Sequence, residues 1–227
     1  MSDSFQVISI NVGKPKPVTF QNKTVHTGIY KESVDDEPLF LSKLNLAGDA
    51  QGNLKLHGGV DKAVCVYPFD HYPYWEKDLN RDVHPGTFGE NLTIEGLTEE
   101  QVNIGDIFGF GEAVVQVTQP RQPCFKIAGK LNRPDMVMKI QQTGFSGYYL
   151  RVLKEGVVAK TDELKRIEVH PMKVTVAFVN GILYRDKWNI QAIRRILDVD
   201  ALAERSKASF EKRLQKALKH LDVSDRE

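Results

Sequence analysis

Short apolar runs, separated by glycine, proline and asparagine, fill residues 1–171 of the chain. The runs are rich in Val, Ile and aromatic residues, which favour strands. The clearest of them are residues 7–12, 64–67, 105–112, 113–118 and 148–153. Many short strands with few helical segments between them predict a mainly β fold, either a barrel or a sandwich.

Helical periodicity interrupts this pattern twice, and one tight turn joins two of the runs. Residues 70–79 and 134–142 each place apolar side chains on one helical face, which predicts two helical insertions. The polar turn at residues 154–156 contains a glycine and separates the runs 148–153 and 157–159. We therefore expect a β-hairpin at this turn.

The pattern changes to a helical one in the C-terminal part. Residues 175–184 are mostly apolar, and Asn189 can cap a helix over residues 190–197. A third helical stripe follows, made of Phe210, Leu214, Ala217, Leu218 and Leu221. We therefore expect two domains, a β-rich one at residues 1–171 and a small three-helix one at residues 172–227.

The predicted C-terminal helices are basic, which leaves two interpretations open. They could form a helix-turn-helix that binds nucleic acid, or they could present a solvated face, which is the commoner use of such charges. The basic side chains are Arg194, Arg195, Arg205, Lys207, Lys212, Arg213, Lys216 and Lys219. The formal net charge of all 227 residues is only +1, so no overall field would recruit nucleic acid.

Composition places the chain among ordinary globular proteins. Hydrophobic residues make up 41% and charged residues 27%, and no apolar run approaches the length of a membrane span. Two cysteines, Cys65 and Cys124, do not form a disulfide framework. The first residues lack a basic region followed by an apolar stretch, so we expect no signal peptide and no membrane partner, and a cytoplasmic location.

Cys124 is the residue most suggestive of chemistry. It lies in a loop with two prolines directly after an apolar strand pattern, between Arg121 and Lys126. Neighbouring cations lower the pKa of a thiol, and a thiolate is a nucleophile or a soft metal ligand. A buried, inert cysteine is the ordinary alternative. Cys65 lies within a continuous apolar run and is interpreted as packed and inert.

Several glycine-containing polar segments could line a site together with this loop. Successive backbone amides at glycines can bind an anion, and His57 and Lys62 would add charge beside Gly58 and Gly59. These segments are residues 22–28, 45–51, 56–62 and 88–93. None of them matches a Walker loop or a dinucleotide fingerprint, and each alone is an ordinary turn or loop.

Two other kinds of site have weaker support in the sequence. A zinc site could use His57, Cys65, His71, His84 and Cys124, but no pair has the close spacing of known zinc motifs. A Cys/His hydrolase could pair Cys124 as nucleophile with His57 as base, but no nucleophile-elbow sequence supports it.

Five segments in order resemble the MOSC domain, which is named for the C-terminal part of molybdenum cofactor sulfurase. Their order and spacing most resemble the bacterial YiiM-like branch, in which a MOSC β-barrel is followed by a small three-helix domain. The resemblance covers nearly the whole chain. The segments are residues 46–49, 57–63, 88–92, 105–106 and 119–124.

The resemblance implies a β-barrel that binds a molybdopterin cofactor, with Cys124 as the molybdenum ligand. The implied activity is reduction of N-hydroxylated compounds, including hydroxylaminopurine base analogues, with electrons from a separate flavoprotein reductase. By position, Lys23 and Thr24 are similar to a Lys-Ser pair that holds the cofactor phosphate in related mitochondrial proteins. The equivalent of Gly89 in those relatives is an arginine, so the pterin contacts would differ here.

Further residues are placed at the site by family motif. Asn91 is similar to an Asn near the pterin, and Arg121 would keep Cys124 as thiolate and stabilise charge on the reacting oxygen. The remaining implied cofactor-binding residues are Asp49, His57, Gly58, Gly59 and Gln122. A homodimer is an open expectation.

Two rival functions remain open at this point. Cys124 could instead carry a persulfide or anchor a cofactor in transit, as in a sulfur or cofactor carrier. Alternatively, the basic C-terminal helices could make the chain a nucleic-acid-binding module, which a steep salt dependence of DNA affinity would reveal.

Overall fold

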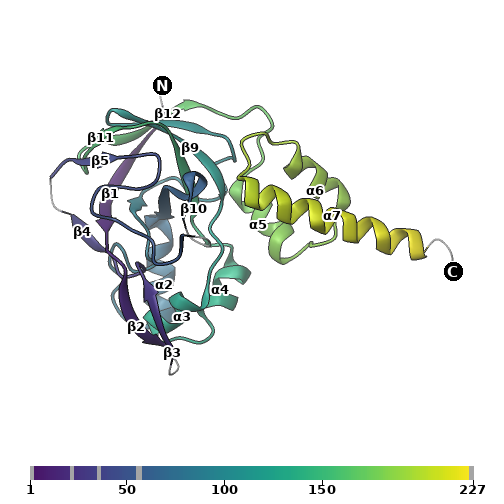
Figure 1. The fold of residues 1–227 in the computed structure, drawn as a ribbon, viewed down its shortest axis with the longest axis horizontal. Coiled ribbons are helices and arrows are strands. Elements are labelled where there is room, and N and C mark those ends of the chain that lie inside the picture. Colours follow the sequence, from purple (N-terminus) through teal and green to yellow (C-terminus); the bar gives the residue numbers. More distant parts are fainter. Residues whose placement is uncertain (1–2, 21–22, 35–36, 55–57, 225–227) are drawn as a thin grey trace.

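Seven strands form a closed barrel in the computed structural model, which describes residues 3–20, 23–34, 37–54 and 58–224 (Figure 1). The order around the barrel is β12-β8-β9-β10-β6-β7-β1, and β12 pairs back with β1. The barrel strands are β1 (Ser4–Val12), β6 (Val64–Pro68), β7 (Leu92–Ile94), β8 (Ile107–Phe110), β9 (Ala113–Pro120), β10 (Tyr148–Lys154) and β12 (Glu163–Glu168). The predicted mainly β fold is therefore confirmed as a barrel.

All neighbours around the barrel are antiparallel except β6 and β7, which run parallel. A further short strand, β4 (Glu32–Val34), pairs with β1 beside the ring. Side chains that point into the ring form the core, and Val64, Val66, Leu92, Val115 and Leu150 are fully buried there. Closure removes the free edges that an open sheet would expose.

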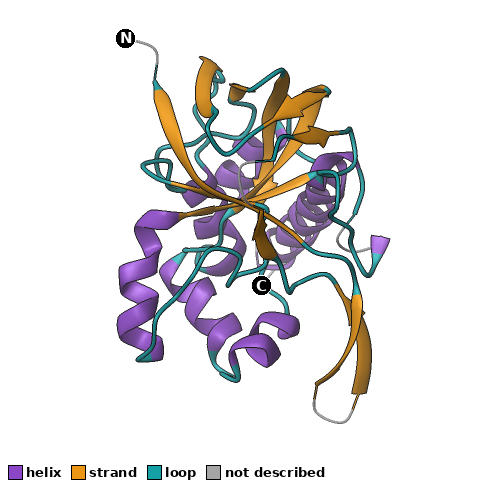
Figure 2. Ribbon diagram, turned by 90° about the vertical axis from the view of Figure 1, so that its left-hand side faces the viewer, coloured by secondary structure: helices purple, strands orange, loops and turns teal. Residues whose placement is uncertain are grey.

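Two small sheets lie outside the barrel. The strands β2 (Lys16–Phe20) and β3 (Lys23–Thr27) form a hairpin that projects from the body of the protein (Figure 2). The strands β5 (Leu39–Leu41) and β11 (Gly156–Val158) form the other sheet.

The hairpin predicted at residues 154–156 is wrong. Both edges of β10 are already hydrogen-bonded, one to β6 and the other to β9. β6 takes one edge of β10 only at residues 148–150, whereas β9 follows the other edge to Lys154; β11 pairs with β5 and not with β10.

Helical insertions cover one end of the barrel. The predictions at residues 70–79 and 134–142 are confirmed by α2 (Tyr72–Leu79) and α4 (Met136–Thr143). A third helix, α3 (Phe125–Leu131), begins directly after Cys124 and was not predicted. The insertions pack around a second apolar cluster, in which the rings of Tyr67 and Phe88 stack with centroids 4.2 Å apart.

The predicted three C-terminal helices are confirmed as α5 (Val176–Tyr184), α6 (Ile190–Leu197) and α7 (Glu204–Ser224). Asn189 caps α6, because its side chain accepts a hydrogen bond of 3.0 Å from the backbone N–H of Ala192. In the predicted stripe of α7, Phe210 and Ala217 are buried and Leu214 and Leu218 are partly buried. The side chain of Leu221 lies outside the described residues. Within the described part of the chain, no helix is long and apolar enough to span a membrane.

The helical unit and the barrel share one continuous core. Val176, Ile193 and Phe210 belong to the same buried cluster as Val115 and Leu150 of the barrel. Backbone hydrogen bonds also cross between the two parts, for example from Ala203 N–H to the carbonyl of Thr118 at 3.1 Å. The start of α7 is therefore fixed against the barrel (Figure 1).

Candidate functional site

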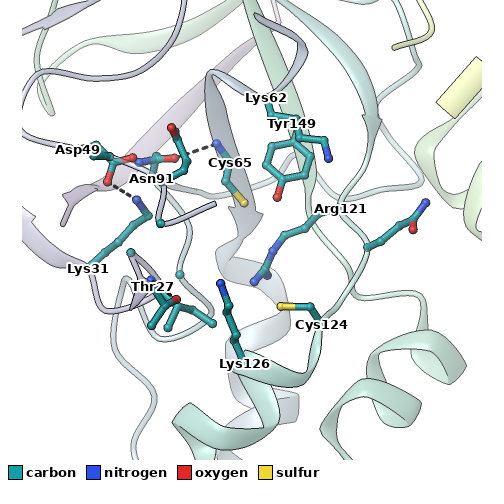
Figure 3. A pocket seen from close by; sticks show the side chains of 17 residues that line it. Thr27, Lys31, Asp49, Lys62, Cys65, Asn91, Arg121, Cys124, Lys126 and Tyr149 are labelled. Atoms are coloured by element: carbon teal, nitrogen blue, oxygen red, sulfur yellow. Dashed lines mark hydrogen bonds and ion pairs between the residues drawn. The ribbon is translucent and has the colours of Figure 1, made fainter. Parts of the chain in front are cut away.

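Cys124 lies at the junction between β9 and α3, where it lines an open pocket. It is the N-cap residue of α3 and has extended backbone angles, φ −126° and ψ 165°. Upstream, Arg121 N–H donates to the carbonyl of Gly147 at 2.9 Å, which ties the start of the loop to the segment before β10. Cys124 is partly exposed, so its thiol is accessible from the pocket (Figure 3).

Arg121 lies in the same pocket with its guanidinium near Cys124 (Figure 3). The side chain is buried, and its Nη2 donates to the carbonyl of Phe88. Burial alone would lower the pKa of Arg121, but the neighbouring Cys65, Tyr149 and Cys124 side chains raise it overall. The pocket therefore holds a fixed positive charge beside the thiol.

The second cysteine, Cys65, also faces this pocket from β6 (Figure 3). Burial raises the pKa of Cys65 to about 11, so its thiol stays protonated and uncharged at neutral pH. The interpretation of Cys65 as a buried residue agrees with its 5% exposure. Its place in the pocket wall was not predicted, because a continuous apolar strand gives no sign of which face opens to a cavity.

Asp49 and Lys31 form a buried ion pair on the opposite wall of the pocket (Figure 3). The side chains are only 1% and 6% exposed, respectively. Oδ1 of Asp49 accepts from Lys31 Nζ and, at 3.0 Å, from the backbone N–H of Gly13. The other oxygen, Oδ2, is buried without a hydrogen-bond partner among the described residues. It is therefore an acceptor available to a ligand with an N–H or O–H group.

Asn91 lines the pocket, but its amide is engaged in holding strands together. Its Oδ1 accepts from Cys65 N–H at 3.0 Å, and its Nδ2 donates to the carbonyl of Asn11 at 3.2 Å. The side chain thus links β1, β6 and the segment that enters β7. Its predicted place at the site agrees with the geometry, and its role toward a cofactor stays a prediction.

Gly89 has no room for a larger side chain. Its φ is +79°, and a Cβ would lie 2.7 Å from Cγ1 of Ile29 and 3.1 Å from the Ile29 carbonyl oxygen. Gly89 also lines the pocket. Any larger side chain at this position would need a different path for the Ile29 segment.

The structure brings together only some of the predicted residues. Asp49, Asn91, Arg121, Gln122 and Cys124 all line the pocket. The other predicted cofactor-binding residues that the structure describes lie outside the pocket lining. Lys23 and Thr24 are exposed on the projecting hairpin, and Gly58 and Gly59 precede the short 3-10 turn Val60–Lys62. His57 lies outside the described residues.

Four further basic and aromatic side chains line the pocket; the sequence points to Lys62 and Lys126 as cations beside its candidate motifs, but not to Lys31 or Tyr149. Lys31, Lys62 and Lys126 add positive charge, and Tyr149 contributes a ring over which Lys62 Nζ lies 5.5 Å from the centroid. Lys62 and Lys126 are sequence neighbours of the Gly58-Gly59 and Cys124 motifs, respectively. Lys31 and Tyr149 are not sequence neighbours of Cys124; Tyr149 reaches the site because β10 pairs with β9, and Lys31 because it pairs with Asp49.

The side chains of the pocket do not form a metal site by themselves. No group of three or more His, Cys, Asp or Glu residues could hold a metal ion among the described residues. Of the zinc candidates, His71 bonds Glu99 through Nε2 at 2.6 Å instead. The pocket suits a metal that arrives with its own organic ligands, because it offers one accessible thiol, several cations and one buried carboxylate oxygen without a partner.

Comparison with known proteins gives two matches to family sequence patterns. The MOSC domain pattern matches residues 53–165, and the pattern described as "YiiM-like, 3-alpha helix domain" matches residues 174–217. The chain is 47% identical over 216 residues to the protein YflK of Bacillus subtilis, covering 95% of this chain and 97% of that one.

Two further similarities extend the comparison. The crystal structure of YiiM from Geobacillus stearothermophilus superposes with a TM-score of 0.79 at 41% identity, covering 92% of this chain and 99% of that one. A longer protein of Gibberella moniliformis named "Reductase" is 36% identical over 163 residues, which are 70% of this chain and 29% of that protein.

Proposed function

The chain belongs to the MOSC domain family, in the YiiM-like branch, and from this premise we propose that it is a molybdenum-cofactor-dependent reductase of N-hydroxylated compounds. The observation that carries the proposal is the accessible Cys124 thiol in a pocket whose charged side chains are mostly cations. The reductase name of one relative supports the same reaction class.

The lining of the pocket suits an anionic cofactor that brings a soft metal. Cys124 would supply the protein's sulfur ligand. Lys126 would balance negative charge on the cofactor, and Asp49 Oδ2 would accept from a pterin N–H group. Arg121 would place its positive charge beside the Cys124 sulfur. Its hydrogen bond to the carbonyl of Phe88 would hold the guanidinium in that position.

The proposed reaction breaks an N–O bond. An N-hydroxylated substrate takes up two electrons and two protons, gains an N–H bond and releases water. When bound, the cofactor would supply the two-electron chemistry. The residues of the chain would orient the substrate, and the cations of the pocket would stabilise the negative charge that develops on the departing oxygen.

The electrons would come from a separate flavoprotein reductase. The sequence contains no dinucleotide fingerprint that would let the chain bind a nicotinamide or flavin donor by that motif. A carrier function for Cys124 shares the same accessible thiol, and the experiment below separates the two.

The test is elemental analysis of the protein made in a host that synthesises molybdopterin. We expect about one molybdenum per chain in the parent, because a single thiol serves as the protein ligand. Cys124→Ala should lose the metal and the reduction of 6-N-hydroxylaminopurine. Cys65→Ala is the matched control, because it removes the other pocket thiol, which is protonated at neutral pH, and it should retain molybdenum.

Two outcomes would count against the reductase. Equal activity of Cys124→Ala and the parent would remove the metal-ligand assignment. Absence of molybdenum from every protein, in a host shown to make the cofactor, would favour the carrier, and Cys124 would then be assayed for persulfide sulfur.

A further inference from the structure

A second, larger groove opens beside the pocket and runs between the barrel and α7. Its volume is about 670 Å³, and it shares Cys124, Lys62, Lys126 and Tyr149 with the first pocket. The first part of α7 supplies its far wall through Arg205, Ser206 and Ser209. The groove thus leads from the thiol to the C-terminal helical unit.

The charges in the groove lining are positive among the described residues. Lys62, Lys126 and Arg205 carry them, and no Asp or Glu side chain lines the groove. The nearby carboxylate of Asp61 is already engaged, because it pairs with Arg151 at 2.8 Å and accepts from Glu204 N–H at 3.2 Å. Burial lowers the pKa of Lys62, and the positive charge of Arg205 lowers it further.

The position of Arg205 is set by the residues on either side of it. Ser206 Oγ donates to Gln119 Oε1 at 2.8 Å in a buried contact at the end of β9. Glu204 N–H is held by Asp61, the residue before Lys62. The start of α7 is therefore fixed to β9 and to the residue before Lys62, and Lys62 and Arg205 line the same groove, where one anion would be attracted to both.

Two aromatic side chains also line the groove. Phe125 is 58% exposed and lines the groove next to Cys124. Tyr149 lines both the groove and the pocket. Purine rings stack readily on such side chains. The groove volume of about 670 Å³ lies within the range of about 300–1,000 Å³ that is usual for pockets that bind small ligands, so a nucleotide has room there.

We infer that this groove binds the phosphate of a nucleotide substrate, with Lys62 and Arg205 on the phosphate and the N-hydroxylated base at Cys124. The inference rests on the proposed function and narrows it to purine nucleoside monophosphates in preference to free bases. It also gives the C-terminal helical unit a role, because α7 supplies the specificity-determining Arg205.

The test compares 6-N-hydroxylaminopurine with its ribonucleoside 5′-monophosphate as substrates of the molybdenum-loaded full chain. The parent should have the higher kcat/KM for the monophosphate. Arg205→Gln should lower the ratio of the two kcat/KM values by about tenfold or more, since a charge-assisted hydrogen bond is lost. Arg205→Lys keeps the positive charge and should therefore retain part of the preference for the monophosphate. Lys212→Gln, which removes an exposed cation of α7 outside the groove lining, should leave the ratio unchanged.

A binding measurement makes the test independent of turnover. Calorimetry with adenosine 5′-monophosphate, an unreactive probe, should show binding to the parent that Arg205→Gln weakens by a similar factor. If neither substrate is reduced but the probe still binds through Arg205, the proposed function fails, whereas the assignment of Arg205 to a nucleotide phosphate stands. If the base is reduced and Arg205→Gln changes neither the ratio nor the binding, the inference is overturned.

The cofactor also carries a phosphate, so one further measurement distinguishes the substrate's phosphate from the cofactor's. The molybdenum content of Arg205→Gln should equal that of the parent if the groove holds the substrate's phosphate. A loss of molybdenum without a change in the ratio would assign Lys62 and Arg205 to the cofactor's phosphate and overturn the inference.

Discussion

The two carboxylate oxygens of Asp49 have different surroundings. Oδ1 neutralises Lys31, whereas Oδ2 is buried without a partner among the described residues. An orphaned buried acceptor costs free energy of folding, and such atoms in native structures commonly mark a ligand position. Without a ligand, the unpaired oxygen would lower the free energy of unfolding, and with a ligand it would accept a hydrogen bond at the pocket wall.

Asp49→Asn tests this residue. The substitution keeps the size of the side chain but leaves the Lys31 ammonium buried without its anion, so we expect a loss of about 3–5 kcal/mol in the free energy of unfolding. Chemical denaturation monitored by circular dichroism measures it. Asp78→Asn is the control, because Asp78 pairs with Lys139 and Arg133 nearer the surface, and it should cost much less. Equal losses for the two variants would show that burial does not set the strength of the Asp49 pair.

The residues that could be predicted as part of the site are those close to Cys124 or within glycine motifs. Arg121 and Gln122 are sequence neighbours of Cys124, and Asp49 and Asn91 belong to recognisable motifs. Lys31 and Tyr149 could not be predicted, since each reaches the pocket only through the pairing of its strand or loop. For Lys23 and Thr24, the correspondence with relatives gave a position in the sequence but not the direction in which the hairpin projects.

At the scale of elements, the sequence predicted which segments are strands better than how the strands pair. Alternation and turn residues located β10 and β11, but β11 pairs with β5, a strand more than 100 residues away, and a local turn pattern carries no information about that partner. The missed helix α3 has a similar cause. Its seven residues follow a proline-rich loop, and only Ile127 and Leu131 are buried, which is too short a pattern to recognise.

Gly89 offers a prediction about an element, the loop that enters β7. Gly89→Ala should destabilise the protein because the new Cβ would collide with Ile29. Gly144→Ala is a matched control, since its φ is +80°, against +79° for Gly89, and nothing lies within 4 Å of the position that its new methyl group would take. The left-handed backbone alone costs about 1 kcal/mol in both variants, and the collision should add about 1–3 kcal/mol at Gly89. Thermal unfolding compares them, and equal melting temperatures would contradict the steric argument.

At the scale of the whole molecule, the division at residues 1–171 and 172–227 stays a prediction. Chain composition changes at that point, yet the buried cluster continues across it. Asn180 of α5, for example, donates to Ser146 Oγ at 2.9 Å, and Arg151 of β10 donates to the carbonyl of Ala201 at 3.0 Å. Such contacts predict that the two parts fold as one cooperative unit, which sequence patterning alone does not reveal.

The two tryptophans allow this cooperativity to be measured, because Trp75 lies in α2 beside the barrel and Trp188 lies between α5 and α6. In a Trp188→Phe background, fluorescence reports the surroundings of Trp75 alone. Ile193→Ala, which removes a fully buried side chain from α6, should lower the free energy of unfolding by about 2–5 kcal/mol. If the barrel and the helical unit unfold together, the free energy of unfolding measured from Trp75 fluorescence must fall by the same amount as that measured by circular dichroism. An unshifted Trp75 transition would mean that α5 to α7 unfold separately, and the groove wall at Arg205 would then be able to open while the barrel stays folded.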